Sequence, residues 1–207
     1  MFIELVRDGR TTQIDLVPSK IIGIGQNYRA HAAEMGKGIP DEPLMFLKPR
    51  SAMLATGGAI KRPPGYERVD YEGELGVVMG AHGSILGFTC VNDVTVRDLQ
   101  KKDVQFTRAK GFDTFCPIGP RIVAGLDPTA LRIVTRVHGA VKQSSSTSDM
   151  IFDVATLVAF VGRHMTLEYG DVITTGTPQG VGNLTPGDTV EIEIEGIGVL
   201  ANTVIPA

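Results

Sequence analysis

Acidic residues stand at two places in the sequence where their spacing could build a metal site. Asp70, Glu72 and Glu74 alternate with other residues in VDYEGELGVV, and Asp93 follows GFTCVN. On a strand, residues two apart share one face, and a hairpin with the next strand would bring Asp93 beside Glu72 and Glu74. Three converging carboxylates suit an octahedral Mg²⁺ or Mn²⁺ that also binds water or substrate oxygens. The alternative is an ordinary solvated acidic face.

Two further places could supply proton transfer and charge stabilisation. His31 and Glu34 are three residues apart in YRAHAAEM, so on a helix they share a face, and the carboxylate could orient the imidazole and raise its basicity. Lys110 precedes Gly111 and Phe112, where partial burial of the ammonium group is possible. A solvated helical turn and a surface lysine are the simpler interpretations of the same residues.

Other chemistries lack the residues that they need. The glycines of GIGQNY and GTPQGVG are followed neither by the third glycine of a dinucleotide fingerprint nor by the Lys-Ser/Thr of a phosphate loop. No Gly-x-Ser-x-Gly elbow occurs, and neither Cys90 nor Cys116 has a partner at zinc-ligand spacing. We therefore expect tight turns at these glycines and buried, structural cysteines.

The elements that must position these residues follow from hydrophobic periodicity and turn residues. A hairpin around Asp8-Gly9 should open the chain. Further strands are expected at residues 20–25, 43–48, 69–79, 85–91, 173–175, 189–195 and 199–204, and helical segments at 28–35, 95–106 and 152–165. The segment 95–106 carries many charges, so we expect it to be largely exposed.

Composition sets the class of protein. The 207 residues are 43% hydrophobic, which favours one folded domain, and 25 glycines with 12 prolines favour many short strands joined by turns. A net charge of −3 makes a nucleic-acid partner unexpected. No apolar run resembles a membrane span or a signal peptide, and two cysteines are too few for a disulfide framework. We expect a cytoplasmic protein with no membrane partner.

Taken in order, several segments resemble the fumarylacetoacetate hydrolase family, from Lys20 to Val204. They are GIGQNYRAHAAEMG, FLKPRSA, VDYEGELGVVMG, GFTCVNDVTVRDLQ, KGFDTFCPIGP, MIFDVATLVAFV and TTGTPQGVG. The resemblance implies a mainly β fold with a few helices (α+β), a mixed β-sandwich roll that usually forms homodimers. It divides the chain into an N-terminal hairpin extension, residues 1–19, and a catalytic domain, residues 20–207.

The resemblance also implies roles for single residues. Glu72, Glu74 and Asp93 match the family's ligands for Mg²⁺ or Mn²⁺, and Lys110 matches its catalytic lysine. His31 and Glu34 match a catalytic pair on a lid, here expected at about residues 29–39, although Ala30 stands where many relatives have Asp. Four positions match substrate-contacting residues: Lys48, Arg50, Gln100 and Thr177.

The short members of this family act on small 2-oxo acids. The resemblance therefore implies a metal-dependent hydrolase that cleaves the carbon–carbon bond of acylpyruvates, which are 2,4-dioxo acids such as fumarylpyruvate or acetylpyruvate. An oxaloacetate decarboxylase or a 2-hydroxymuconate-type isomerase or decarboxylase would use the same site, because all stabilise an enolate. A non-catalytic metal-binding protein is the third alternative.

Overall fold

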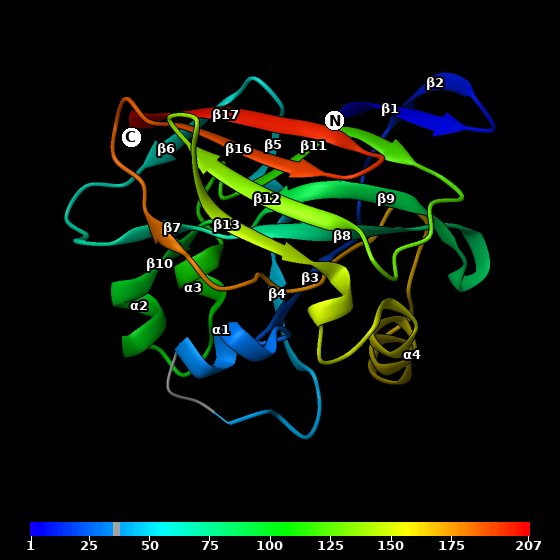
Figure 1. The fold of residues 1–207 in the computed structure, drawn as a ribbon, viewed down its shortest axis with the longest axis horizontal. Helices are drawn as coiled ribbons and strands as arrows, with labels where there is room; N and C mark the ends of the chain where they lie inside the picture. The colour runs from blue at the N-terminus through cyan, green and yellow to red at the C-terminus, as the bar shows by residue number, and fades with distance from the viewer. Residues whose placement is uncertain (35–37) are drawn as a thin grey trace.

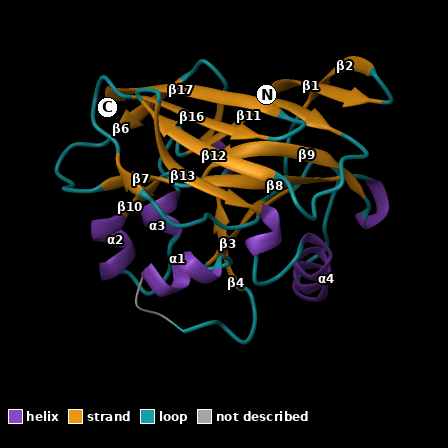
Figure 2. Cartoon of the chain, in the orientation of Figure 1, coloured by secondary structure: helices purple, strands orange, loops and turns teal. Residues whose placement is uncertain are grey.

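The structure is a computed structural model that describes residues 1–34 and 38–207. Within these residues the strands form three sheets, and helices are few (Figures 1 and 2). The largest sheet has the order β2-β1-β11-β9-β8-β14-β3-β4, with β5 paired to β11. Its strands are β1 (Phe2–Arg7), β2 (Arg10–Asp15), β3 (Ile21–Gly25), β4 (Leu44–Lys48), β5 (Met53–Ala55), β8 (Gly73–Met79), β9 (Ile85–Asn92), β11 (Cys116–Val123) and β14 (Val172–Thr174).

Two smaller sheets complete the β structure. The five-stranded sheet has the order β13 (Ala140–Ser146), β12 (Arg132–Val137), β16 (Thr189–Ile194), β17 (Gly198–Pro206) and β6 (Ala59–Arg62). The three-stranded sheet has the order β10 (Thr95–Val96), β7 (Val69–Tyr71) and β15 (Gly182–Asn183). The helices are α1 (Arg29–Glu34), α2 (Arg97–Lys102), α3 (Thr107–Lys110) and α4 (Val154–His164). Mixed sheets with few helices confirm the predicted fold class.

The main core lies between the nine-stranded and five-stranded sheets. Alternate residues of β8, such as Leu75 and Val77, face the same cluster as Ile133 and Ile192 of the smaller sheet, and all four are fully buried. This alternation is what places one face of each strand in the core. Helix α4 covers one end of this core.

Helix α4 confirms the helix predicted at residues 152–165. Its apolar residues recur at helical spacing, and Val154, Leu157 and Val161 are buried in the main core. Asp153 is its N-cap and accepts a hydrogen bond from the Thr156 amide at 2.8 Å. Figure 1 shows α4 well separated from α1, α2 and α3, which gather at the other side of the molecule.

One edge of the large sheet collects the ends of five strands. Strands β3 and β14 are parallel and both run toward this edge, whereas β8 and β4 begin there and β9 ends there. The chain leaves β3 toward α1, leaves β14 into the segment TGTPQG, and leaves β9 at Asp93. The topology therefore brings segments that are distant in sequence to one place.

Two sequence predictions for the elements are wrong in detail. The predicted continuous strand at residues 69–79 is broken at Glu72, which separates β7 from β8. The predicted exposed helix at residues 95–106 is instead strand β10, helix α2 and a loop before α3. Arg97 and Leu99 of α2 are buried, and the expected exposure holds only toward the end of the segment, at Lys101, Lys102, Val104 and Gln105.

The N-terminal hairpin forms as predicted, with β1 and β2 antiparallel around Asp8-Gly9. Strand β1 also pairs in parallel with β11 through Glu4–Val6 and Arg121–Val123, so the hairpin extends the large sheet. In the part of the chain that the structure describes, no helix is long and apolar enough to cross a membrane.

Candidate active site

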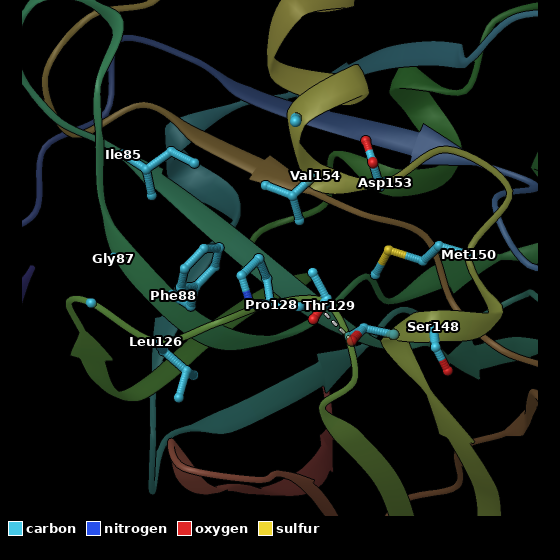
Figure 3. Close-up of a pocket in the computed structure, with 13 residues that line it drawn as sticks. Ile85, Gly87, Phe88, Leu126, Pro128, Thr129, Ser148, Met150, Asp153 and Val154 are labelled. Atoms are coloured by element: carbon cyan, nitrogen blue, oxygen red, sulfur yellow. Dashed lines mark hydrogen bonds between the residues drawn. The ribbon is translucent and has the colours of Figure 1, made fainter.

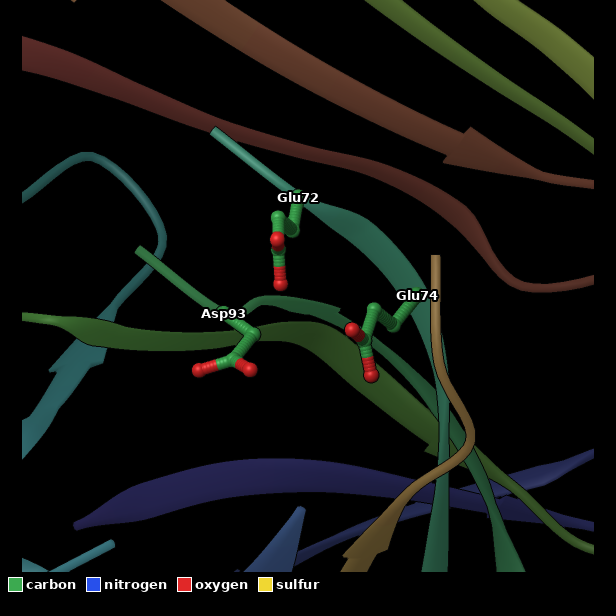
Figure 4. Close-up of side chains that lie close together, drawn as sticks. All are labelled: Glu72, Glu74 and Asp93. Atoms are coloured by element: carbon green, nitrogen blue, oxygen red, sulfur yellow. The ribbon is translucent and has the colours of Figure 1, made fainter. Parts of the chain in front are cut away.

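The carboxylates of Glu72, Glu74 and Asp93 converge at the edge where the five strand ends meet (Figure 4). One oxygen from each lies within 4.8 Å of the others, and all three residues are buried. The Asp93 amide donates to the Glu72 carbonyl at 2.9 Å. This hydrogen bond joins the turn after β9 to the residue that separates β7 from β8. The hairpin predicted from the sequence therefore exists and brings Asp93 to the two glutamates.

Three buried basic side chains contact two of these carboxylates. Lys48 Nζ donates to Asp93 Oδ1 at 2.5 Å, and Lys110 Nζ donates to Glu72 Oε2 at 2.8 Å and also to Asp93 Oδ2. Arg97 Nη2 donates to Glu72 Oε1 at 2.5 Å. Buried charges are stable only when they are paired, so these contacts account for the burial of Glu72 and Asp93.

The same contacts shift the ionisation of the group. Burial alone would raise the pKa of Glu72, but Lys110 and Arg97 hold that pKa well below its ordinary value. Burial alone would lower the pKa of Lys110, but Asp93 and Glu72 raise it. Glu72 is therefore a carboxylate and Lys110 an ammonium ion at neutral pH.

Glu74 differs from its two neighbours. Its Oε2 accepts a hydrogen bond from the Gly176 amide at 2.8 Å, but it has no basic partner within residues 1–34 and 38–207. Burial, and then the charges of Asp93 and Glu72, raise the pKa of Glu74 well above its ordinary value. A divalent cation at the convergence of the three carboxylates would supply the missing charge, so the residues present fit Mg²⁺ or Mn²⁺.

Asp70 does not join this group, contrary to its predicted place on a shared face. The strand is interrupted at Glu72, so side chains two residues apart no longer share one face there. The Asp70 carboxylate is hydrogen-bonded to two arginines instead. Its Oδ1 accepts from Arg68 Nε at 2.8 Å, and its Oδ2 accepts from Arg97 Nε at 2.7 Å. Asp70 therefore fixes Arg97, which in turn contacts Glu72.

His31 and Glu34 lie on α1 and contact each other as their spacing predicts. His31 Nδ1 is 3.1 Å from Glu34 Oε2, and Glu34 also accepts weakly from the Gly180 amide at 3.3 Å. His31 is 5% exposed and lies at the wall of the site, whereas the Glu34 side chain is 41% exposed and faces solvent. The predicted lid at residues 29–39 includes residues 35–37, which lie outside the described residues.

A pocket of about 290 Å³ opens above the carboxylates. It collects residues from β3, β4, α1, α2, α3 and the segment after β14, and its wall includes His31, Glu72, Glu74, Arg97, Gln100, Lys110 and Thr177, with Ile24, Phe46 and Phe106 as apolar contacts. Lys48 is buried behind this wall against Asp93. Arg50 is exposed and does not line the pocket, so the structure does not bring it to the site.

A larger cavity, of about 640 Å³, lies elsewhere, between β9 and the start of α4 (Figure 3). Its wall is mostly apolar and includes Phe88, Leu126, Pro128, Met150 and Val154. Asp153 is its one carboxylate, and that group caps α4. This cavity lacks the convergent charged groups that acid–base or metal chemistry needs.

Two residues of the site escaped sequence analysis. The sequence predicts an exposed helix around Arg97, whereas the structure buries this side chain against Asp70 and Glu72. Gln143 lies on β13, and its buried amide hydrogen-bonds to Gly73 and Thr177. Nothing in the local pattern of AVKQSSS marks this glutamine, because its partners are far away in the sequence.

Comparison with known proteins adds a family to this geometry. A family model described as fumarylacetoacetate (FAA) hydrolase C-terminal matches residues 20–205. An uncharacterized protein of Methanocaldococcus jannaschii is 54% identical over 200 residues, covering 92% of this chain and 84% of that protein. The oxaloacetate tautomerase YisK of Bacillus subtilis is 43% identical over 211 residues, covering 90% of this chain and 70% of that protein.

Solved structures agree with this match. The crystal structure of a 5-carboxymethyl-2-hydroxymuconate delta-isomerase from Mycobacterium smegmatis has a TM-score of 0.87 to this chain at 44% identity. The similarity covers 96% of this chain and 86% of that structure.

Proposed function

Because this chain belongs to the fumarylacetoacetate hydrolase family, we propose that it is a divalent-metal-dependent enzyme that interconverts the keto and enol forms of a small 2-oxo acid. One observation carries the proposal: Glu72 and Glu74 of a buried three-carboxylate group line the same pocket as His31, whose ring contacts Glu34. The names of relatives that are a tautomerase and an isomerase favour this reaction class.

The charges of the site suit an anionic substrate once a cation is bound. Four buried acids face three buried bases, which leaves one net negative charge: Asp70, Glu72, Glu74 and Asp93 against Lys48, Arg97 and Lys110. A divalent cation held by Glu72, Glu74 and Asp93 would supply Lewis-acid stabilisation of negative charge on the 2-oxo oxygen. The site as a whole would then be positive, which favours a carboxylate substrate.

His31 is the proposed acid–base residue. With Nδ1 held by Glu34, its Nε2 is the ring nitrogen left to accept a proton from C3 of the substrate and to return it at the enol oxygen. Glu34 fixes the orientation of the ring and stabilises the imidazolium ion. Phe46, Phe106 and Ile24 supply apolar wall that excludes bulk water from the proton transfer.

Hydrolysis of an acylpyruvate, the activity expected from the sequence, is the second candidate. The pocket of about 290 Å³ has the volume of roughly ten waters at ~30 Å³ each, so it has room for an attacking water beside a small dioxo acid. His31, oriented by Glu34, would then take its proton from that water instead of from carbon. Decarboxylation of oxaloacetate needs neither proton transfer to start the reaction nor an attacking water.

The test measures three reactions with one protein preparation. Loss of the enol of oxaloacetate by ultraviolet absorbance, release of pyruvate from acetylpyruvate, and release of carbon dioxide from oxaloacetate are each followed with Mg²⁺, with Mn²⁺ and with a chelator. We expect tautomerisation above the metal-only blank, abolished by the chelator. His31→Asn should reduce it by about 10²–10⁴-fold, the usual cost of losing a general acid–base.

His138→Asn is the matched control, because His138 also pairs with a carboxylate, Asp188, but its side chain is 58% exposed and it does not line the pocket. This variant should retain full activity. Pyruvate release from acetylpyruvate with no tautomerisation would replace the first candidate by the second. Rates equal to the metal-only blank for all three reactions would overturn the proposal.

A further inference from the structure

Gln143 connects the five-stranded sheet to the candidate metal carboxylates. It lies on β13, is 1% exposed, and its side-chain amide reaches β8 and the segment after β14. The approach is close: a Cβ on Gly73 would lie 3.2 Å from Gln143 Oε1 and 2.1 Å from Thr135 Oγ1. Position 73 therefore requires glycine, and the backbone there is held directly against the second sheet.

Three hydrogen bonds close a ring through Gln143, Gly73 and Thr177. The Gly73 amide donates to Gln143 Oε1 at 3.0 Å, Gln143 Nε2 donates to Thr177 Oγ1 at 2.8 Å, and Thr177 Oγ1 donates to the Gly73 carbonyl at 3.0 Å. Gln143 Nε2 also donates to the Pro178 carbonyl at 2.8 Å. Both amide hydrogens and the oxygen of Gln143 are thus used within the ring or beside it.

Resting on the proposed function, we propose that Gln143 is a positioning residue that sets the geometry of the metal carboxylates and of Thr177. Gly73 is the single residue between Glu72 and Glu74, and the ring engages both its amide and its carbonyl. The ring thus fixes the backbone from which both carboxylates project. A shift of that backbone would separate the carboxylates, which must converge to share one cation.

The ring also fixes what Thr177 can offer to a substrate. A hydroxyl group has one hydrogen to donate and two lone pairs. The hydrogen is donated to the Gly73 carbonyl, and one lone pair accepts from Gln143, so one lone pair is left. Thr177 lines the pocket and can there only accept a hydrogen bond, which suits a protonated enol oxygen and not a carboxylate.

The same segment links the metal carboxylates to the histidine–glutamate pair. The Gly176 amide donates to Glu74, and the Gly180 amide donates to Glu34, with the atoms bound by Gln143 between them. Gln143 thus anchors the segment that spans the two halves of the site. A glutamine that only filled space would not affect cation binding beyond its effect on folding.

The experiment measures Mn²⁺ affinity by titration calorimetry, with thermal unfolding of the same metal-free samples. Gln143→Met keeps the size of the side chain but removes all three hydrogen bonds, and we expect Mn²⁺ to bind about 10–100-fold more weakly. Thr177→Val opens the ring from its other side and should also weaken Mn²⁺ binding. The double variant should bind no more weakly than Gln143→Met, because both changes break one ring.

Asn202→Leu is the matched control. Asn202 is a buried amide on β17 of the same sheet, and it donates to two carbonyls, those of Ala55 and Gly58, away from the pocket. This variant should unfold at a lower temperature and bind Mn²⁺ with the affinity of the parent.

The possible outcomes separate the two proposals. If the parent binds Mn²⁺ and Gln143→Met binds it equally well, the positioning role is wrong while the metal site stands. If Gln143→Met does not fold, Thr177→Val decides: unchanged Mn²⁺ affinity in that variant overturns the role. If the parent itself does not bind Mn²⁺, the proposed function fails, and the positioning role fails with it.

Discussion

The three carboxylates of the site are not equivalent residues, although the sequence presents them as one group. Asp93 contacts Lys48 and Lys110, whereas the one hydrogen bond that Glu74 accepts from the described residues comes from the Gly176 amide. In the metal-free protein Asp93 therefore stabilises the fold by pairing buried cations, and Glu74 does not. Loss of Asp93 should consequently destabilise the metal-free fold, whereas loss of Glu74 should not.

Glu74→Gln should keep or slightly raise the stability of the metal-free protein and strongly weaken Mn²⁺ binding. Burial and the charges of Asp93 and Glu72 raise the pKa of Glu74, so its neutral form, which glutamine resembles in shape, is favoured more than in an ordinary carboxyl group. Asp93→Asn should instead cost about 3–5 kcal/mol of unfolding free energy, because it leaves buried ammonium groups unpaired. Urea unfolding of both metal-free variants and Mn²⁺ titration check the contrast.

A destabilised Glu74→Gln protein with unchanged Mn²⁺ affinity would contradict the assignment. It would mean that Glu74 supports the fold and does not bind the cation. The two variants control for each other, since they alter neighbouring carboxylates by the same chemical change.

Residue spacing predicted the parts of the site that depend on local geometry. The pair His31 and Glu34 follows from one helical turn, and the meeting of Glu72 with Asp93 follows from one hairpin. Arg97 was missed because its burial depends on ion pairs with Asp70 and Glu72, which no helical pattern reveals. The roles of these residues in catalysis stay predictions.

At the scale of the elements, Asp171 holds the parallel strands β3 and β14 together at the edge opposite the site. Its carboxylate accepts from the Ser19 amide at 2.9 Å and hydroxyl at 2.8 Å, the Lys20 amide at 3.1 Å and ammonium at 2.5 Å, and the Glu168 amide at 2.9 Å. One side chain thus fixes where both strands begin. Their relative register decides where α1 and the segment after β14 meet.

Burial acts to raise the pKa of Asp171, but the hydrogen bonds from Lys20, the Glu168 amide and Ser19 outweigh it and lower the pKa. A carboxyl group whose pKa is lower in the folded state stabilises the fold above its unfolded value of about 3.9, and this stabilisation is lost as pH falls through the folded value. Its contribution is therefore greatest at neutral pH and disappears in acid.

Asp171→Asn should cost about 2–3 kcal/mol of unfolding free energy at neutral pH, because an amide cannot satisfy five donors. The difference from the parent should shrink as pH is lowered below about 4, measured by urea unfolding at several pH values. Asp127→Asn is the control: Asp127 is exposed, accepts from the Thr129 amide at 3.0 Å, and its replacement should cost far less. A constant difference at every pH would show that the charge of Asp171 does not contribute.

Elements were predictable where hydrophobic periodicity reports burial. Helix α4 has a regular apolar stripe, and β16 alternates glutamates with buried apolar residues, so both were predicted nearly to their ends. The charged residues of segment 95–106 suggest exposure, whereas Arg97 is buried by its ion pairs and Leu99 packs in a hydrophobic cluster with Val69 and Val96 of the three-stranded sheet. Charge indicates exposure only where the charged group has no buried partner.

At the scale of the whole molecule, the site lies where two sheets, three helices and the segment after β14 come together. No single element contains it: β8 and the residues next to β8 and β9 provide the carboxylates, α1 provides His31 and Glu34, α3 provides a lysine, and the five-stranded sheet provides Gln143 (Figures 1 and 4). The resemblance also implies a homodimer, which stays a prediction. A cation bound at this site contacts residues from several elements and binds only the folded state, so it should raise the free energy of unfolding of the whole molecule.

Mn²⁺ should therefore raise the unfolding temperature of the parent protein. A cation present at 100 times its dissociation constant adds about 2.7 kcal/mol, which for a chain of this length corresponds to roughly 5–10 °C. Oxalate, which resembles the enolate of a 2-oxo acid, should add a further increase only when Mn²⁺ is present. Glu74→Gln should lose both increases, whereas Asp171→Asn should start from a lower unfolding temperature and keep both. If Mn²⁺ raises the unfolding temperature of Glu74→Gln as much as that of the parent, the cation binds elsewhere. If oxalate raises the unfolding temperature without Mn²⁺, the anion is bound by the basic residues of the pocket and not through the cation.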